Sequence, residues 1–330
     1  MLSVQVDQDQ LAIGKHFHIA FMRTLRIPDD GHEYPLPPGL GTFPICRVED
    51  YADRVPDSWR EHGGVFIPMY QREALWVNFE GHAWHPVAAK LAVGKINAIS
   101  GQAWDQRLLQ FEQDYVVVPD QPWLDGINAG DGFIKQFVAM PLGMGYTVEG
   151  QLTGKEEFGG IQLIVFDAKP GRFPEKPPQP SRTVADMDMV CYCCSPAPGL
   201  EMGLGAGGRM RQKIYPDDYG FDTWDPEHYG RVYIHIVNSM LYREITGKEP
   251  PPTPISARTY TEYGLPWFDL YDEAKGDVTV STELAGVKSI KEKDLEHGFT
   301  GQQDDGTVAI APGQTVTLGK SPNTVEDGKW

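Results

Sequence analysis

The amino-acid sequence predicts a β-rich α+β fold, with a sandwich or barrel-like antiparallel core and a few short peripheral helices. The chain of 330 residues contains 36 glycines and 27 prolines, which favours many turns and short elements over long helices. Several segments alternate apolar and polar residues with the period of two that half-buried strands show. A hydrophobic fraction of 41% is enough for a sizeable core at this length.

The first part of the chain, residues 1–170, is predicted to be the β-rich core. Apolar side chains recur at alternate positions in Lys15–Ile27, as in a strand with one buried face. Val65–Tyr70 and Ala74–Phe79 flank a short polar turn and are expected to pair as a hairpin. Ile161–Phe166 is almost wholly apolar, which favours a central strand.

The composition changes in the middle of the chain. Proline, glycine and cysteine crowd residues 171–212, which are interpreted as a linker or a long loop. The next segment, 213–298, is expected to supply a strand at Val232–Val237 and short helices that pack on the same core. Residues 299–330 are predicted to form a polar tail.

Two helices are expected in the C-terminal part. Ile255–Tyr263 follows Thr253 and Pro254, an N-cap residue and a proline suited to the first helical turn, and Gly264 marks its end. Ser281–His297 carries a narrow apolar stripe at helical spacing. Both segments are predicted to lie outside the sheet.

The charge balance excludes some classes of partner. The chain carries 29 Lys and Arg against 46 Asp and Glu, a formal net charge of −17. This negative charge repels phosphate groups, so neither nucleic acid nor an anionic membrane is an expected partner. No secretory leader precedes the first strand, and no apolar run reaches the ~20 residues of a transmembrane helix. Four cysteines fit a reducing compartment, so a cytoplasmic location is expected.

Three histidines form the candidate site for a transition metal. His16 and His18 are two residues apart in a predicted strand, so their side chains share one face. His235 alternates with Arg231 and Tyr233 along a second predicted strand, a pattern that suits a ligand-binding wall or an acid–base site. Together with an acidic residue, the three imidazoles would bind zinc or iron. The alternative is polar residues on solvated strand faces.

A second candidate metal site is an acidic loop. Asp217, Asp218, Asp222 and Asp225 lie close together in a glycine-containing segment. Carboxylate oxygens are the ligands that calcium prefers, although the spacing differs from that of an EF-hand. The alternative is a surface loop in which the aspartates stabilise turns. A divalent metal ion is therefore the one cofactor that the sequence suggests, and no cofactor is identified.

Other motifs are weaker. Gly203–Gly208 matches the spacing of a dinucleotide-binding loop, but no apolar strand precedes it. His82 and His85 flank a tryptophan in a turn, where they would bind a metal or cover an edge. Trp267–Glu273 mixes aromatic and acidic side chains, a composition found in binding sites and in surface straps. The sequence contains no complete catalytic motif.

Three stretches resemble an uncharacterised family of bacterial and fungal hypothetical proteins. They are TLRIPDDG at 24–31, PWLDGINAG at 122–130 and GLPWFDLY at 264–271. The family carries no activity that the resemblance would transfer. The resemblance implies only that the two halves of the chain, up to about residue 298, belong together as one unit.

Two functions are consistent with these observations. The favoured one is a non-catalytic binding or assembly protein, because no catalytic set is complete and the β pattern is rich in loops. Self-association into a homo-oligomer is a natural extension, since open sheet edges need cover. The alternative is a metal-dependent enzyme that uses the strand histidines His16, His18 and His235.

Overall fold

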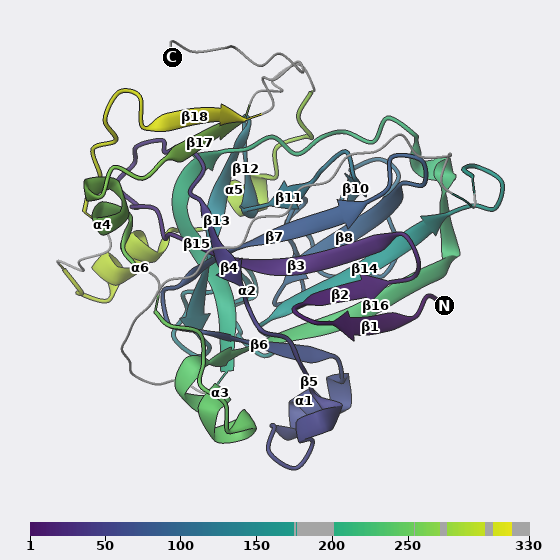
Figure 1. Ribbon diagram of the computed structural model, residues 1–330, viewed down its shortest axis with the longest axis horizontal. Coiled ribbons are helices and arrows are strands. Elements are labelled where there is room, and N and C mark those ends of the chain that lie inside the picture. The colour runs from purple at the N-terminus through teal and green to yellow at the C-terminus, as the bar shows by residue number, and fades with distance from the viewer. Residues whose placement is uncertain (175, 177–200, 254, 271–275, 301–305, 319–330) are drawn as a thin grey trace, which may run out of the picture.

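The computed structural model describes residues 1–174, 176, 201–253, 255–270, 276–300 and 306–318. In these residues the chain forms a sheet of 16 strands, a separate two-stranded sheet and several short helices (Figure 1). The large sheet is almost entirely antiparallel and does not close into a barrel. The predicted β-rich α+β class, with an antiparallel core and short peripheral helices, is confirmed.

The large sheet follows one main path with short strands attached to it. Hydrogen-bonded neighbours along the path are β1 (Val4–Asp7), β2 (Gln10–Ile13), β3 (Phe17–Thr24), β7 (Ala74–Gly81), β13 (Phe133–Pro141), β15 (Glu201–Arg211), β16 (Trp224–Asn238), β14 (Ile161–Ala168), β8 (Val87–Val93) and β10 (Val116–Val118). The attached strands are β4 (Gly39–Thr42), β5 (Cys46–Arg47), β6 (Val65–Met69), β9 (Ile96–Asn97), β11 (Trp123–Leu124) and β12 (Gly126–Gly130).

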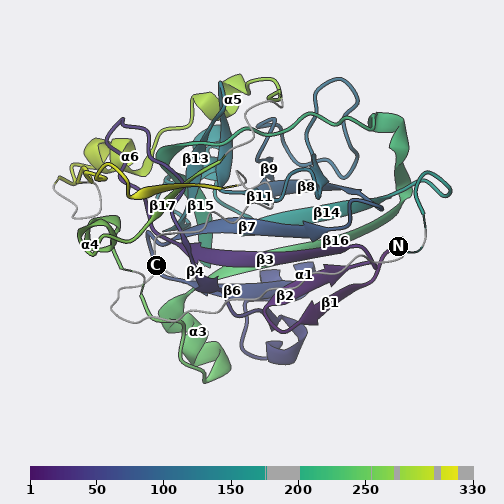
Figure 2. The ribbon, with the colours of Figure 1, turned by 45° about the horizontal axis from the view of Figure 1, so that its top comes forward.

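The helices lie at the periphery, as both views show (Figures 1 and 2). They are η1 (Glu49–Tyr51), α1 (Asp57–His62), α2 (Val148–Thr153), η2 (Phe221–Thr223), α3 (Ser239–Thr246), α4 (Ala257–Glu262), α5 (Thr282–Ala285) and α6 (Ile290–Glu296). The second sheet pairs β17 (Trp267–Leu270) with β18 (Thr315–Leu318) in parallel.

Alternating burial places hydrophobic clusters on both faces of the sheet. In β14, Leu163 and Val165 belong to the largest cluster, which also contains Leu11 and Leu284 from the two ends of the described chain. The intervening Ile164 joins a smaller cluster on the opposite face. Ile161–Phe166 is thus covered on both faces, in agreement with its nearly continuous apolar sequence.

The predicted hairpin of Val65–Tyr70 with Ala74–Phe79 is not formed. β6 pairs in parallel with β16, with Val65 opposite Ile234, and on its other side with β5. β7 instead pairs with β3 along its whole length. The long antiparallel register between β3 and β7 satisfies more backbone groups than a hairpin with the short β6 would.

The predicted linker at 171–212 also differs from the structure in its described part, because β15 occupies Glu201–Arg211 between β13 and β16. Its glycines permit close packing. A Cβ atom at Gly207 would lie 2.6 Å from Cγ2 of Val138, and one at Gly208 would overlap the carbonyl oxygen of Pro28. Residues 177–200 lie outside the described part of the chain.

The C-terminal elements are shorter than expected. The helix predicted at 255–263 corresponds to α4, but 281–297 divides into α5 and α6. Ser289 starts α6 with a capping box, in which its hydroxyl accepts from the Glu292 amide and the Glu292 carboxylate accepts from the Ser289 amide. Part of the predicted polar tail, 299–330, forms β18.

Candidate functional site

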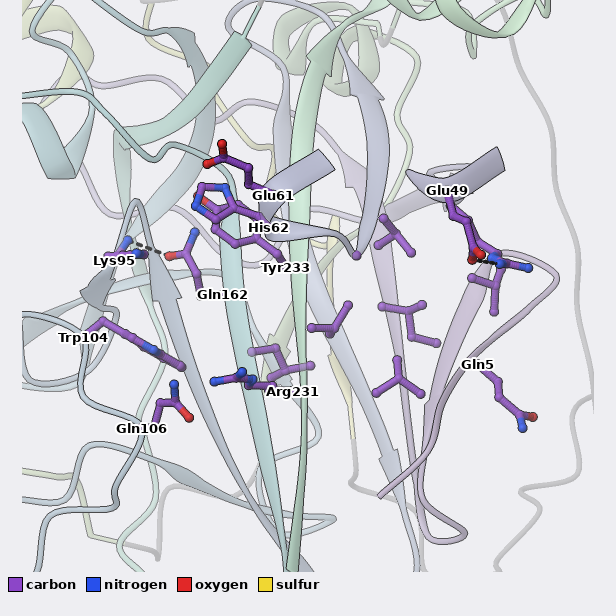
Figure 3. A pocket seen from close by; sticks show the side chains of 18 residues that line it. Gln5, Glu49, Glu61, His62, Lys95, Trp104, Gln106, Gln162, Arg231 and Tyr233 are labelled. Carbon is purple, nitrogen blue, oxygen red and sulfur yellow. Dashed lines mark hydrogen bonds and ion pairs between the residues drawn. The ribbon is translucent and has the colours of Figure 1, made fainter. Parts of the chain in front are cut away.

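A pocket of about 970 Å³ lies where the sheet is open between β16 and the β1–β2 hairpin (Figure 3). At one end the amide of Leu2 donates to the carbonyl of Tyr229 at 2.7 Å. At the other end β16 pairs with β6 from Ile234 onwards. Residues 230–232 of β16 pair with β14 on one side, but no described strand pairs with them on the side that faces the β1–β2 hairpin. The opening there leads from the outer face of the sheet into its core.

A tight turn between β8 and β9 positions the basic wall of the pocket. Lys95 has a positive φ of 58°, which the sequence permits because Gly94 completes the turn. The amide of Lys95 donates to Oε1 of Gln162 at 2.6 Å, and Nε2 of Gln162 donates to the Gly159 carbonyl at 2.9 Å. The ammonium of Lys95 lies 3.8 Å from the ring centroid of Phe158. The hydrogen bonds of Gln162 hold the turn, and the Phe158 ring positions the ammonium.

Four rings stack behind the pocket. Trp59 of α1 stacks on His235 with centroids 4.5 Å apart, His235 stacks on Tyr233 at 4.3 Å, and Tyr233 stacks on His62 at 4.7 Å. Tyr233 and His62 line the pocket, whereas the other two rings are buried. The Tyr233 hydroxyl donates to the carbonyl of Phe158 at 2.6 Å, so this wall is rigid.

Burial determines the protonation of these rings. It lowers the pKa of His235 to about 3, so this imidazole is neutral and its Nε2–H donates to the Gly63 carbonyl at 3.0 Å. The pKa of His62 is lowered by burial and by the nearby Lys95 ammonium. Burial also raises the pKa of Tyr233. Neutral rings therefore line this wall.

The rim of the pocket carries charges of both signs with a positive excess. Arg47 and Glu49 form an ion pair with each other at one side. Lys95, Arg231 and Glu61 remain, and within the described residues the guanidinium of Arg231 forms no hydrogen bond or ion pair. In a chain of net charge −17, this local excess of positive charge favours an anion.

The inner part of the pocket is aliphatic. Val4 and Val6 from β1 and Val232 from β16 are half-buried and pack on the core, while Leu11 and Leu163 form the floor. Figure 3 shows Lys95, Gln162 and Arg231 on one side of β16, and Gln5 and Glu49 on the other side. Because Val232 is adjacent to Arg231 on one strand, the two side chains face opposite sides of the sheet.

The three histidines predicted to bind a metal do not converge. His16 lies in the turn before β3, and its ring stacks face to face on His85 with centroids 3.9 Å apart. His18 is half-buried on β3 opposite Ala12 and Glu80, and His235 belongs to the ring stack. Across the ranges that the structure describes, no three His, Cys, Asp or Glu side chains are arranged to hold a metal ion.

The contacts of His85 show why the stacked pair of His16 and His85 differs from a metal site. Its Nε2 lies 2.7 Å from Oδ1 of Asp167, and its Nδ1 lies 2.9 Å from the carbonyl oxygen of Pro174. Both ring nitrogens are thus engaged by protein acceptors. Stacking also directs the nitrogens of His16 and His85 along parallel planes instead of toward a shared centre.

The acidic loop stabilises a turn. Oδ1 of Asp217 accepts the amides of Tyr219 and Gly220, and its Oδ2 accepts the Tyr115 hydroxyl at 2.7 Å and the Trp224 indole at 2.9 Å. Asp225 accepts the amide two residues later, and Asp218 and Asp222 are exposed. The four carboxylates predicted as calcium ligands therefore form no common site in the structure.

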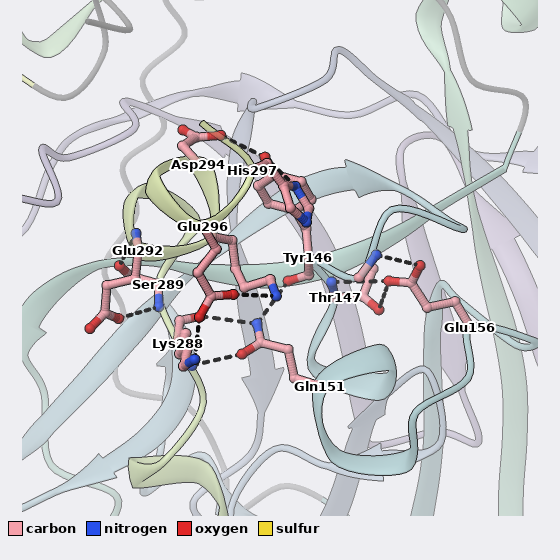
Figure 4. A network of polar contacts seen from close by, with 12 residues as sticks. Tyr146, Thr147, Gln151, Glu156, Lys288, Ser289, Glu292, Asp294, Glu296 and His297 are labelled. Carbon is pink, nitrogen blue, oxygen red and sulfur yellow. Dashed lines mark hydrogen bonds and ion pairs between the residues drawn. The ribbon is translucent and has the colours of Figure 1, made fainter. Parts of the chain in front are cut away.

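A second polar network lies apart from the pocket and holds α6 against the sheet (Figure 4). The Tyr146 hydroxyl donates to Asp294 at 2.8 Å, and Arg72 donates to both oxygens of the same carboxylate. Nδ1 of His297 lies 3.2 Å from the Tyr146 hydroxyl. Because that hydroxyl donates its only proton to Asp294, the hydroxyl oxygen accepts and Nδ1–H of His297 donates. These contacts join α6 to Tyr146 and Arg72, so the network has a structural role.

The sequence pattern pointed to Arg231 and Tyr233 as a ligand wall, and the structure places both at the pocket. It gave no indication of Lys95, Gln162 or His62. Gly94, a residue typical of tight turns, was the one available signal in the sequence.

No protein-family model, curated protein or solved structure gives a significant match to this chain. None of the helices in the described ranges is long and apolar enough to cross a membrane.

Proposed function

We propose that this protein is a non-catalytic binding protein, and that the pocket between β16 and the β1–β2 hairpin binds a small organic anion. The observation that carries the proposal is the guanidinium of Arg231, which stands at the rim without a partner among the described residues. Lys95 lies on the same wall and is held by its backbone. A carboxylate or phosphate group would pair with the Arg231 guanidinium, and Lys95 adds positive charge to the same rim.

The polar groups of the pocket support binding over catalysis. The Tyr233 hydroxyl is committed to the Phe158 carbonyl, and burial raises its pKa, so it is a poor general acid or nucleophile at neutral pH. His62 lies flat against Tyr233. The size of the pocket is at the upper end of the range for small-molecule sites.

The experiment is calorimetric titration of the full chain with a panel of aliphatic and aromatic carboxylates and organic phosphates. Arg231→Gln is expected to weaken binding by about tenfold or more, because a hydrogen bond between charged groups is lost. Binding should also weaken as salt is added.

Arg258→Gln is the matched control, since Arg258 is an exposed arginine on α4 that does not line the pocket. It removes the same charge and should leave binding unchanged. Equal losses in both variants, or no binding of any anion in the panel, would contradict the proposed function.

A further inference from the structure

The opening in the sheet joins two chemically different surfaces. The outer face presents Arg231, Lys95 and Gln162, and the inner side presents Val4, Val6 and Val232. Both surfaces line one continuous pocket. A ligand that used only the charged rim would leave the aliphatic part of the pocket in contact with water.

We infer that the ligand is an amphipathic anion, with a carboxylate or phosphate head at the rim and an unbranched aliphatic tail that enters the sheet between β16 and β1. This inference rests on the proposed function and names its ligand class. The head lies beside Arg231, and the tail passes the unpaired edge of β16 to reach Val232.

The burial of the valines supports a tail at this position. Val4, Val6 and Val232 are only half-buried although they pack on the largest hydrophobic cluster. Beneath them, Leu11 and Leu163 are almost wholly buried, at 0% and 1% exposure. An alkyl chain over the valines would remove the remaining apolar surface from water, a favourable change of about 25 cal/mol per Å².

The edge of β16 explains why the tail can enter here. Gly230 stands at the base of the opening, where a Cβ atom would lie 2.6 Å from a methyl group of Ile13. At this glycine β16 packs closely against Ile13 of β2 and against Leu2, just before β1. Beyond it, no described strand pairs with this side of β16 until Val65 of β6, which lies opposite Ile234. The gap has an apolar interior and a polar rim.

The test is a chain-length series on the unaltered protein. Butanoate, hexanoate, octanoate and decanoate are titrated calorimetrically below their micelle concentrations, with octanol as the uncharged analogue. Full burial of each added methylene strengthens binding about fourfold. Octanoate is therefore expected to bind at least about tenfold tighter than butanoate, and octanol much more weakly than octanoate.

A pair of variants locates the tail. Val6→Trp fills the aliphatic part of the pocket and should abolish the dependence on chain length while butanoate still binds. Asp7→Trp is the control, because Asp7 is the exposed neighbour on β1 and does not line the pocket. If Val6→Trp fails to fold, Val4→Phe tests the same wall.

The outcomes separate the two proposals. Equal affinity for butanoate and octanoate would overturn the aliphatic tail and leave anion binding standing. Octanol that binds as tightly as octanoate would overturn the charged head. Absence of binding for every carboxylate and for the alkyl phosphates of the wider panel would overturn the amphipathic ligand, and binding of any other anion of that panel would leave the proposed function standing. A chain-length dependence that persists in Val6→Trp would place the tail elsewhere.

Discussion

Gln212 forms two hydrogen bonds with the buried Asp125, one to its carboxyl group and one to its backbone. Its Nε2 donates to Oδ2 of Asp125 at 2.6 Å, and its Oε1 accepts the backbone N–H of Asp125 at 3.0 Å. Burial nevertheless raises the pKa of Asp125 to about 7, because the charged form loses its hydration. This carboxyl group therefore titrates near neutral pH in the folded protein.

The first prediction concerns the pH dependence of stability. In the unfolded chain Asp125 ionises near pH 4, so the folded state binds more protons between that pH and about 7. Its contribution is fully present below pH 4 and is lost as the pH rises through 7. In the unaltered protein, this group should lower the free energy of unfolding by about 2 kcal/mol between pH 5.5 and 8.5. Asp125→Asn should abolish this decrease. Urea denaturation measures it, and parallel pH profiles for both proteins would refute it.

The second prediction concerns the protonation of His235. Because burial lowers its pKa to about 3, the imidazole should remain neutral from pH 5 to pH 8, with its proton on Nε2. Nuclear magnetic resonance of ¹⁵N-labelled histidine tests this, with the His235→Gln spectrum providing the assignment. A titration midpoint near 6.5, the value of an unperturbed histidine, would show that the ring is exposed to water.

The third prediction concerns the buried ion pair of Arg23 and Glu73. The side chains are 6% and 1% exposed, and Oε1 of Glu73 accepts two hydrogen bonds from the guanidinium at 2.9 and 2.8 Å. Glu73→Ala should lower the free energy of unfolding by about 3–5 kcal/mol, because it leaves a buried cation without its partner. The double replacement Arg23→Met with Glu73→Leu should recover most of that loss.

An exposed pair provides the control for this experiment. Arg243 and Glu249 form an ion pair 3.2 Å apart, with side chains 66% and 73% exposed. Glu249→Ala should change the free energy of unfolding by less than about 1 kcal/mol. Similar losses at both pairs, measured by chemical denaturation, would mean that burial does not distinguish them.

The fourth prediction concerns the attachment of α6. Tyr146→Phe removes a hydrogen bond to the charged carboxylate of Asp294, which should cost about 1.5–3 kcal/mol. The effect should appear as faster hydrogen exchange in α6, since Asp294 belongs to that helix. Tyr263→Phe alters an exposed tyrosine and serves as control. Unchanged exchange in α6 would show that Tyr146 does not hold the helix.

Local patterns in the sequence predicted individual strands and not their neighbours. The alternation in Lys15–Ile27 marks β3, because a strand with one buried face alternates apolar and polar residues. The apolar run Ile161–Phe166 marks β14, because this strand is buried on both faces. The partner of β6 lies far along the chain, so no local signal distinguishes β16 from β7. The glycines of β15 suggest a loop in the sequence. The structure shows instead that neighbouring atoms leave no room for side chains at these positions of the strand.

The candidate site was predictable to a similar extent. Arg231 and Tyr233 alternate on one strand, so their shared face follows from the sequence. Lys95 reaches the same wall from a turn, and His62 reaches it from the last residue of α1. Long-range packing brings these groups together. The predicted metal site of His16, His18 and His235 is not formed for the same reason. His16 stacks on His85, which comes from a separate loop that the local pattern does not reveal.

The parallel pairing of β6 with β16 has a consequence for how the chain folds. Val65 and Ile234 are neighbours in space but are separated by about 170 residues of sequence. Closing so long a loop is entropically costly, and contacts of this kind slow folding. During synthesis β6 must wait until most of the chain has left the ribosome, with one edge unpaired in the meantime. The nascent first half is therefore exposed to aggregation, and chaperones that shield strand edges would raise the yield of folded protein.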